Sequence, residues 1–332
     1  MSCAESKRDP AFDLLKGIAI FMVVLSHVIG YRDGFSHITE QSYTANFIAM
    51  CNMHIFFAVS GYFSVKVINA KVLLRRIVNY FWPCAVFAIL YGLFNFVSWR
   101  NLPFVAIKAF FFNNWFFWVL AFCDITLYLA RKSRHEIIVL SICLIMSSCV
   151  ANHVWYMSFY QEMLPFYVMG IYLLPMLKTR LSSRCMCMSL VAYLMVVFFS
   201  GNVAKNGLGF YWDHFVLVNP SLESFFNLTA RLAMGALGVC ALMFIANYLI
   251  SHFSVATFLG NMVGRRTLQV FFIHGFLVHS ISNKLCQLDT PMPILYLSTV
   301  AVTVLSVALT LITETSDAAA RIFWGPFNVR KR

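Results

Sequence analysis

The sequence predicts an all-α polytopic membrane protein that crosses the bilayer about ten times. Of its 332 residues, 61% are hydrophobic and only 11% are charged, and 34 are Phe. A water-soluble domain of this length has too small an interior to enclose that much apolar surface. The apolar segments are continuous rather than alternating with polar residues, which favours membrane helices over a transmembrane barrel.

Ten apolar segments have the length, about 17 to 25 residues, that a membrane-spanning helix needs. They lie near residues 12–31, 45–65, 77–98, 114–130, 136–152, 160–177, 185–201, 224–250, 267–284 and 292–313. A further apolar stretch at 98–113 predicts a short interfacial or re-entrant helix. No internal repeat or Pro-rich linker divides the chain, so we expect one membrane domain over residues 1–332.

The basic residues predict the orientation of the bundle. The formal net charge is +12, and most of the 25 Lys and Arg residues fall in the termini and in loops on one side of the predicted spans. Because basic loops stay in the cytoplasm, both termini are expected there. This asymmetry explains the charge without nucleic acid as a partner. Clusters such as 131–134 and the basic tail 314–332 are suited to contact anionic membrane lipids.

The cysteines do not predict a metal site. Most of the ten lie inside predicted spans, where a Cys usually behaves as a small apolar residue. Cys185 and Cys187 form the one close pair, and two ligands are too few for a zinc ion. We therefore expect no metal.

The first apolar segment carries three residues that a simple membrane anchor does not need: Asp13, Lys16 and His27. Lys16 and His27 are eleven positions apart, about three helical turns, so they share one face at an axial separation of ~16 Å. Asp13, three residues before Lys16, can pair with it. A titratable group inside a membrane predicts function, although a His can also bond a neighbouring helix and a Lys can simply reach the interface.

This segment resembles the first helix of the integral-membrane acyltransferase-3 family, in which an Arg is followed, after ten residues, by a His. Lys16 takes the place of the Arg and keeps its charge without the bidentate fork, and the spacing to His27 is retained. Other segments resemble family elements in the same order, over about residues 8–280: MHIFFAVSGYF at 53–63, KVLLRRIVNYFWP at 71–83, NWFFWVL at 114–120, LPFYVMGIYL at 164–173 and GRRTLQVFFIH at 264–274. Since no hydrolase-like domain follows, we expect the stand-alone type.

The resemblance implies an O-acyltransferase in the bacterial cytoplasmic (inner) membrane. It would move an acyl group, expected to be acetyl, from acetyl-CoA to a hydroxyl of a cell-surface or lipid-linked glycan. His27 would accept the proton of that hydroxyl or take the acyl group itself, with Asp13 and Lys16 beside it in the catalytic set. The phosphates of CoA are expected to meet cations that face the cytoplasm, namely Lys16, Lys71, Arg75 and Arg76.

Four further residues are candidates for binding the substrate: Ser60, Trp115, Arg231 and His274. Each also has a plainer interpretation, since Ser60 suits a tight helix contact, Trp115 an interfacial anchor and His274 a bond to a neighbouring helix. Arg231, like Asp124, needs a partner or water within the membrane.

The alternative function is a secondary transporter or glycan flippase. Such proteins often show two related halves with interrupted helices at matching positions. No such symmetry is visible in this sequence, and the deep polar residues gather unequally around the first helices. The sequence therefore favours the acyltransferase.

Overall fold

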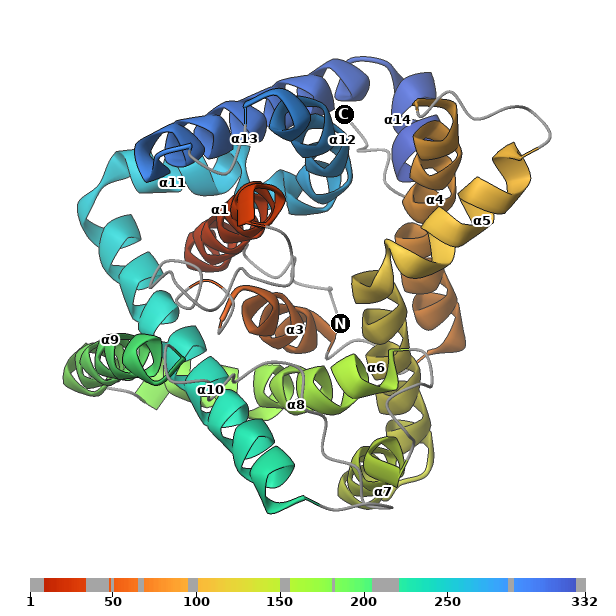
Figure 1. Cartoon of the computed structure of the whole chain (residues 1–332). Helices are drawn as coiled ribbons and strands as arrows, with labels where there is room; N and C mark the ends of the chain where they lie inside the picture. Colours follow the sequence, from red (N-terminus) through yellow and green to blue (C-terminus); the bar gives the residue numbers. More distant parts are fainter. Residues whose placement is uncertain are drawn as a thin grey trace. The chain divides into compact units, whose positions relative to one another are not determined.

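A computed structural model of the chain describes residues 9–33, 48, 51–64, 69–94, 101–149, 156–180, 183–204, 221–285 and 290–326. The regular structure in these residues is helical, as predicted (Figure 1). In chain order the elements are α1 (Pro10–Asp33), α3 (Asn52–Phe63), α4 (Ala70–Phe94), α5 (Leu102–Phe112), α6 (Trp115–Lys132), α7 (Glu136–Cys149), α8 (Met157–Arg180), α9 (Ser183–Ala204), α10 (Leu222–His252), α11 (Ser254–Met262), the 3-10 helix η2 (Gly264–Arg266), α12 (Thr267–Leu285), α13 (Met292–Glu314) and α14 (Asp317–Trp324).

Each of the ten predicted apolar segments overlaps one of these helices, and α5 lies within the segment predicted to be interfacial or re-entrant. Within the described residues, four helices are long and apolar enough to cross a membrane, namely α1, α4, α10 and α13. The pair α5 and α6, bent by 53°, gives a fifth if it is counted as one span. The chain thus has the character of a membrane protein. Of the predicted span 45–65, residues 45–47, 49, 50 and 65 lie outside the described residues.

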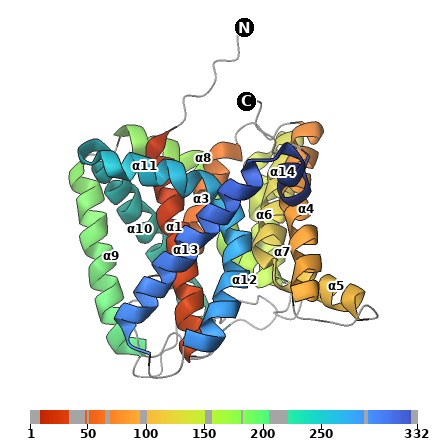
Figure 2. The ribbon, with the colours of Figure 1, turned by 90° about the horizontal axis from the view of Figure 1, so that it is seen from above.

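The chain forms two compact units, each assembled from separate stretches of sequence. The first unit consists of residues 1–59, 177–209 and 233–307. Within it, α1 contacts α11, η2 and α12, and Figures 1 and 2 show α1 in red beside α12 in blue. Side chains from every face of α1 are buried, among them Phe12, Leu15 and Ile20. A helix that is apolar all round is an inner helix, and this one carries the predicted catalytic residues.

The second unit consists of residues 60–176, 210–232 and 308–332. Here α4 packs against α5 and α6, and α6 packs against α7. Most of the window that qualifies α4 as a membrane span is not buried by the protein, in contrast to α1. A long apolar helix with this much exposed surface is suited to face lipid.

Part of the predicted basic tail is a folded helix. The Ser316 side chain caps α14 by accepting a hydrogen bond from the backbone N–H of Ala319 at 3.4 Å. α14 packs on α4, where the buried Trp324 ring stacks on Phe87 with centroids 5.6 Å apart. The Trp82 indole of α4 also donates a hydrogen bond to the Ile322 carbonyl at 2.8 Å. Residues 327–332, which hold the terminal basic cluster, lie outside the described residues.

Candidate active site

Asp13 and Lys16 form the predicted pair at the start of α1. The Lys16 ammonium lies 2.8 Å from Asp13 Oδ1, with the two side chains one helical turn apart. Asp13 is 4% exposed, whereas the Lys16 side chain keeps 21% of its surface accessible. The carboxylate therefore pairs with the ammonium itself, while part of the Lys16 side chain stays accessible.

A second cation, which entered the sequence analysis only as one of the basic residues that predict orientation, also meets Asp13. The Arg265 Nε atom of η2 lies 3.6 Å from Asp13 Oδ2, and 34% of the Arg265 side chain is exposed. Lys16 and Arg265 thus approach the two oxygens of one carboxylate from different elements. Nothing in the spacing of residue 13 and residue 265 along the chain could have predicted this contact.

Glycines bring the backbone of η2 against that of α1. A Cβ atom added to Gly264 would overlap the backbone carbonyl of Asp13, and one added to Gly260 would press on the backbone of Leu14. A Cβ on Gly17 would in turn lie 3.4 Å from the Gly264 nitrogen. Small residues permit this close packing in membrane helices. The first turns of α1 are therefore positioned against η2 by main-chain contact.

The buried side chain of Arg266, the residue after Arg265, stabilises the junction of α11 and η2. Arg266 is 8% exposed, and its Nη1 atom donates to the backbone carbonyls of Met262 at 3.2 Å and Asn261 at 3.5 Å. These carbonyls belong to the end of α11, where helical carbonyls need outside donors. The two adjacent arginines consequently differ in role, because Arg266 caps a helix whereas Arg265 reaches Asp13.

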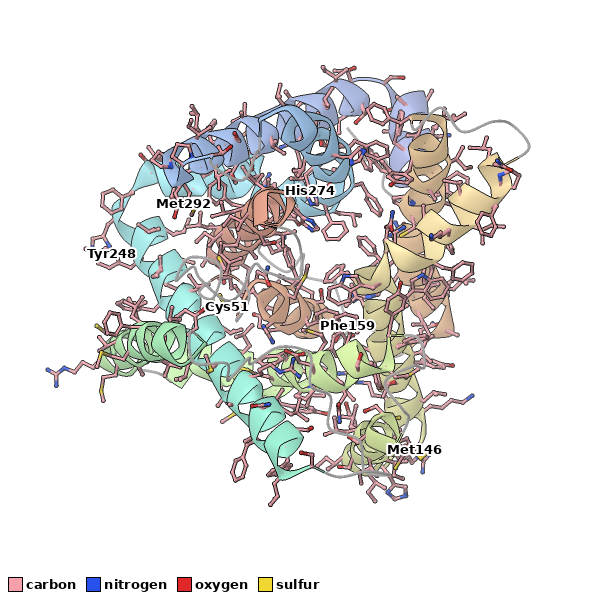
Figure 3. The ribbon with its side chains drawn as sticks, viewed as in Figure 1. Cys51, Met146, Phe159, Tyr248, His274 and Met292 are labelled. Carbon is pink, nitrogen blue, oxygen red and sulfur yellow. The ribbon has the colours of Figure 1, made fainter. Side chains whose placement is uncertain are left out.

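The deep histidine of α1 lies beside the histidine of α12. The ring centroids of His27 and His274 are 5.2 Å apart, with an interplanar angle of 57°. His274 is 3% exposed, and Figure 3 shows its side chain on the part of α12 near α1. Its Nδ1 atom lies 3.0 Å from the Val270 carbonyl oxygen, an acceptor only, so Nδ1 carries the proton. The neutral His274 ring then has its lone pair on Nε2.

These residues bring both predicted functional positions of α1 into one compact unit. Asp13 and Lys16 occupy the first turns of α1, and His27 follows ~16 Å further along the same face. η2 and α12, which are continuous in sequence, supply Arg265 at one level and His274 at the other. The charged residues at the start of α1 and the imidazole pair thus lie at two levels along α1.

The second unit holds a buried ionic cluster centred on Asp124, which is 0% exposed. The Arg76 guanidinium binds this carboxylate with two nitrogens, at 2.8 Å from Nε and 3.0 Å from Nη2. The Tyr80 hydroxyl donates to Asp124 Oδ2 at 3.0 Å, and the Tyr167 hydroxyl donates to Oδ1. The side chain of Arg76, predicted to bind the cofactor, is thus oriented by Asp124, whereas Lys71 and Arg75 are exposed.

The other predicted substrate-binding residues also lie in this unit. Ser60 is half-buried, next to Gly61, whose added Cβ would overlap the Tyr167 carbonyl. The Trp115 ring stacks on Phe159, with centroids 4.3 Å apart and planes tilted by 21° (Figure 3 labels Phe159). The guanidinium of Arg231, predicted to need a partner, lies 3.4 Å from a Glu162 oxygen.

Comparison with known proteins decides the family. The family model described as an acyltransferase domain, that of the acyltransferase-3 family, matches residues 9–313. The chain belongs to the acyltransferase-3 family. No curated protein matches the sequence, and no solved structure matches it either.

Membership of the acyltransferase-3 family confirms the resemblance found in the sequence and supports an acyltransferase activity. The matched range contains both histidines, the Asp13 cluster and the Asp124 cluster, and it ends before α14. Within the described residues, no three His, Cys, Asp or Glu side chains come close enough together to hold a metal ion.

Proposed function

We propose that this acyltransferase moves an acetyl group from acetyl-CoA to a hydroxyl of a cell-surface or lipid-linked glycan at the bacterial inner membrane. Family membership supports acyl transfer in general. The approach of His27 to His274, at 5.2 Å between ring centroids and on the same helix as the Asp13–Lys16 pair, carries the assignment of the site. The transporter alternative gains no support from either observation.

In the proposed reaction His27 is the general base. The acceptor hydroxyl oxygen bonds to the carbonyl carbon of the thioester, and the carbon–sulfur bond breaks. His27 takes the hydroxyl proton and returns it to the departing CoA sulfur, so atoms and charge balance without another reagent. Imidazole suits both transfers near neutral pH, and general-base catalysis of this kind contributes about 10²–10⁴-fold.

His274 is proposed to orient the acceptor. Its Nδ1–H is held by the Val270 carbonyl, which leaves the Nε2 lone pair as a fixed acceptor for a hydroxyl hydrogen. His274 is buried, as are most of the apolar residues of α1 around His27. Such surroundings limit the access of water and hence hydrolysis of the thioester.

For the donor, Lys16 is the proposed phosphate contact in the first unit, and Lys71 and Arg75 are the exposed candidates in the second. Within the second unit, Arg76 is proposed to act with Lys71 and Arg75, oriented by Asp124. Ser60, Trp115 and Arg231 are proposed contacts of the acceptor. Stacking on Phe159 holds the Trp115 ring in one orientation, which suits an aromatic surface for a sugar.

The test combines glycan analysis with a histidine substitution. Mass spectrometry of surface glycans from cells with and without the gene should show loss of one acyl mass, which names donor group and acceptor together. His27→Gln keeps hydrogen bonding but cannot accept the proton, so the purified protein should lose about 10²–10⁴-fold in transfer. The control is His252→Gln, because His252 is exposed and its Nδ1 atom lies 2.8 Å from the Tyr248 carbonyl oxygen of its own helix. Near-normal turnover by His27→Gln would sink the assignment of His27 as base.

A further inference from the structure

The cluster of Lys16, Asp13 and Arg265 has more positive charge than its own partners neutralise. Two cations approach one carboxylate, at 2.8 Å and 3.6 Å, so the three side chains carry one surplus positive charge. The nearest acid in sequence, Asp9, accepts a hydrogen bond from the Ala11 N–H at 3.0 Å and so caps the start of α1. The surplus positive charge therefore belongs to Lys16 and Arg265, which share the single carboxylate of Asp13.

The donors of the two cations are only partly used. A Lys ammonium has three N–H groups and an Arg guanidinium has five. Asp13 forms an ion pair with the Lys16 ammonium at 2.8 Å, and it faces Arg265 only through Nε, at a distance longer than a good hydrogen bond. Among the described residues, no other side chain pairs with either cation. With 21% and 34% of their side chains exposed, Lys16 and Arg265 can present the remaining N–H groups to a ligand.

The position of Arg265 is fixed by its surroundings rather than by the ion pair. Gly264, just before it, contacts the α1 backbone so closely that no Cβ fits, and Arg266, just after it, is bonded to the end of α11. Both neighbours of Arg265 are thus held. A simple topological signal in a membrane protein needs positive charge but no such placement.

We infer that Lys16 and Arg265 together bind a phosphate group of the acyl donor, with Asp13 as the residue that positions both cations. This inference rests on the proposed function, since it takes the donor to be a CoA thioester. It adds Arg265, which had been attributed to topology alone, as the second cation of the donor site. Charge-assisted hydrogen bonds from an ammonium and a guanidinium to one phosphate are the strong, oriented kind.

The distance along α1 fits this assignment. A phosphate held at the level of Lys16 lies ~16 Å from the level of His27 along the helix axis. In CoA the phosphates and the reactive sulfur are at opposite ends of a long, flexible pantetheine arm. A phosphate at Lys16 and Arg265 therefore allows the arm to follow the α1–α12 contact and deliver the thioester to the two histidines.

The experiment measures binding of CoA, without acceptor or turnover, to protein in nanodiscs of zwitterionic lipid. Arg265→Gln should weaken CoA binding by about tenfold to a hundredfold, the size of a lost charge-assisted contact. Binding of pantetheine, which has no phosphate, should not change. Arg265→Lys should lose less than Arg265→Gln because it keeps the charge. The matched control is Arg321→Gln, which removes an exposed arginine of α14 and should bind CoA as the unmodified protein does.

Wild-type affinity of Arg265→Gln for CoA would overturn the inference. A parallel measurement in nanodiscs that contain phosphatidylglycerol would then show whether the variant has lost a preference for this lipid, in which case the pair holds a lipid headgroup and not CoA. If Arg265→Gln does not fold, Lys16→Gln tests the same site, since Arg265 still faces Asp13 there. Because no acyl transfer is measured, CoA binding through Arg265 stands even if His27→Gln proves active, and the two proposals fail separately.

Discussion

Each compact unit contains a buried aspartate that binds an arginine, and the two aspartates differ in how completely they are enclosed. Asp124 is 0% exposed and receives four hydrogen bonds, two from Arg76 and one each from Tyr80 and Tyr167. Asp13 receives Lys16 and, at a longer distance, Arg265, and both of these cations keep accessible surface. One carboxylate is saturated by its own protein, whereas the other leaves donors for a ligand.

This difference teaches how to distinguish a structural ion pair from a binding site in a membrane helix. A charge inside the bilayer needs a partner in either case, so the presence of a partner decides nothing. The useful observation is whether the positive charge and the hydrogen-bond donors around the carboxylate match the carboxylate's own charge and acceptors. They balance at Asp124 and leave a surplus at Asp13.

The largest effect should come from removing the enclosed carboxylate. Asp124→Ala leaves the Arg76 guanidinium without its partner in the interior, and breaking such a buried pair costs about 3–5 kcal/mol in the free energy of unfolding. Asp13→Ala should cost less, because Lys16 and Arg265 can turn toward water. Denaturant unfolding in one detergent would measure both. Equal losses for the two variants would remove the contrast between a closed and an open cluster.

Two adjacent arginines provide a control for that experiment. Arg76→Ala should lower stability much as Asp124→Ala does, since it leaves the carboxylate unpaired. Arg75→Ala, at an exposed position on the same helix, should leave stability nearly unchanged and act, if at all, on the KM for acyl-CoA. A normal melting temperature for Arg76→Ala would contradict the stabilising role of the Arg76–Asp124 pair.

A smaller effect is expected where α1 meets η2. In Gly264→Ala the new methyl group would overlap the Asp13 carbonyl, and overpacking of this kind costs about 1–3 kcal/mol. Transfer activity should fall as well, because η2 leads directly into the helix of His274. Gly275→Ala is the matched control, since a Cβ there meets nothing within 4 Å among the described residues apart from its own stretch of helix, and it should be neutral or stabilising by about 0.5–1 kcal/mol. Similar melting temperatures for the two variants would contradict the close contact.

The smallest effect should follow substitution of Lys16. Lys16→Arg keeps the positive charge that a phosphate needs and should retain most activity. Lys16→Gln should raise the KM for acyl-CoA by about tenfold, one charge-assisted contact, with little change in the KM for the acceptor. Steady-state kinetics with each substrate varied in turn would measure both. If Lys16→Gln matches the unmodified enzyme, Lys16 is a boundary residue and the open cluster has no donor role.

Local patterns in the sequence predicted the helices and one ion pair. Length and apolarity predicted a helix at each of the ten segments, because an apolar helix is recognised from its own residues alone, although only four or five of the described helices are candidate spans. The Asp13–Lys16 pair was predictable for the same reason, since residues three apart on a helix are neighbours.

Contacts between distant segments were not predictable. Asp124 was expected to need a partner, but neither Arg76 nor the two tyrosines could be identified as that partner from one sequence. Arg265 gave only a topological signal, although the small residues Gly260 and Gly264 around it are the sort that mark close helix packing. α14 did leave a signal, Ser316 as N-cap and Gly325 after the last turn, but its eight residues are too short for a span pattern.

The packing of α14 on α4 has a practical consequence for work with the purified protein. A truncation before residue 316, chosen because the sequence there looks like a solvated basic tail, would remove the helix that covers Phe87 and that accepts the Trp82 hydrogen bond. The newly exposed aromatic surface would favour aggregation in detergent. Affinity tags and fluorescent fusions should therefore be joined after residue 326, where the described helix and its glycine cap have ended.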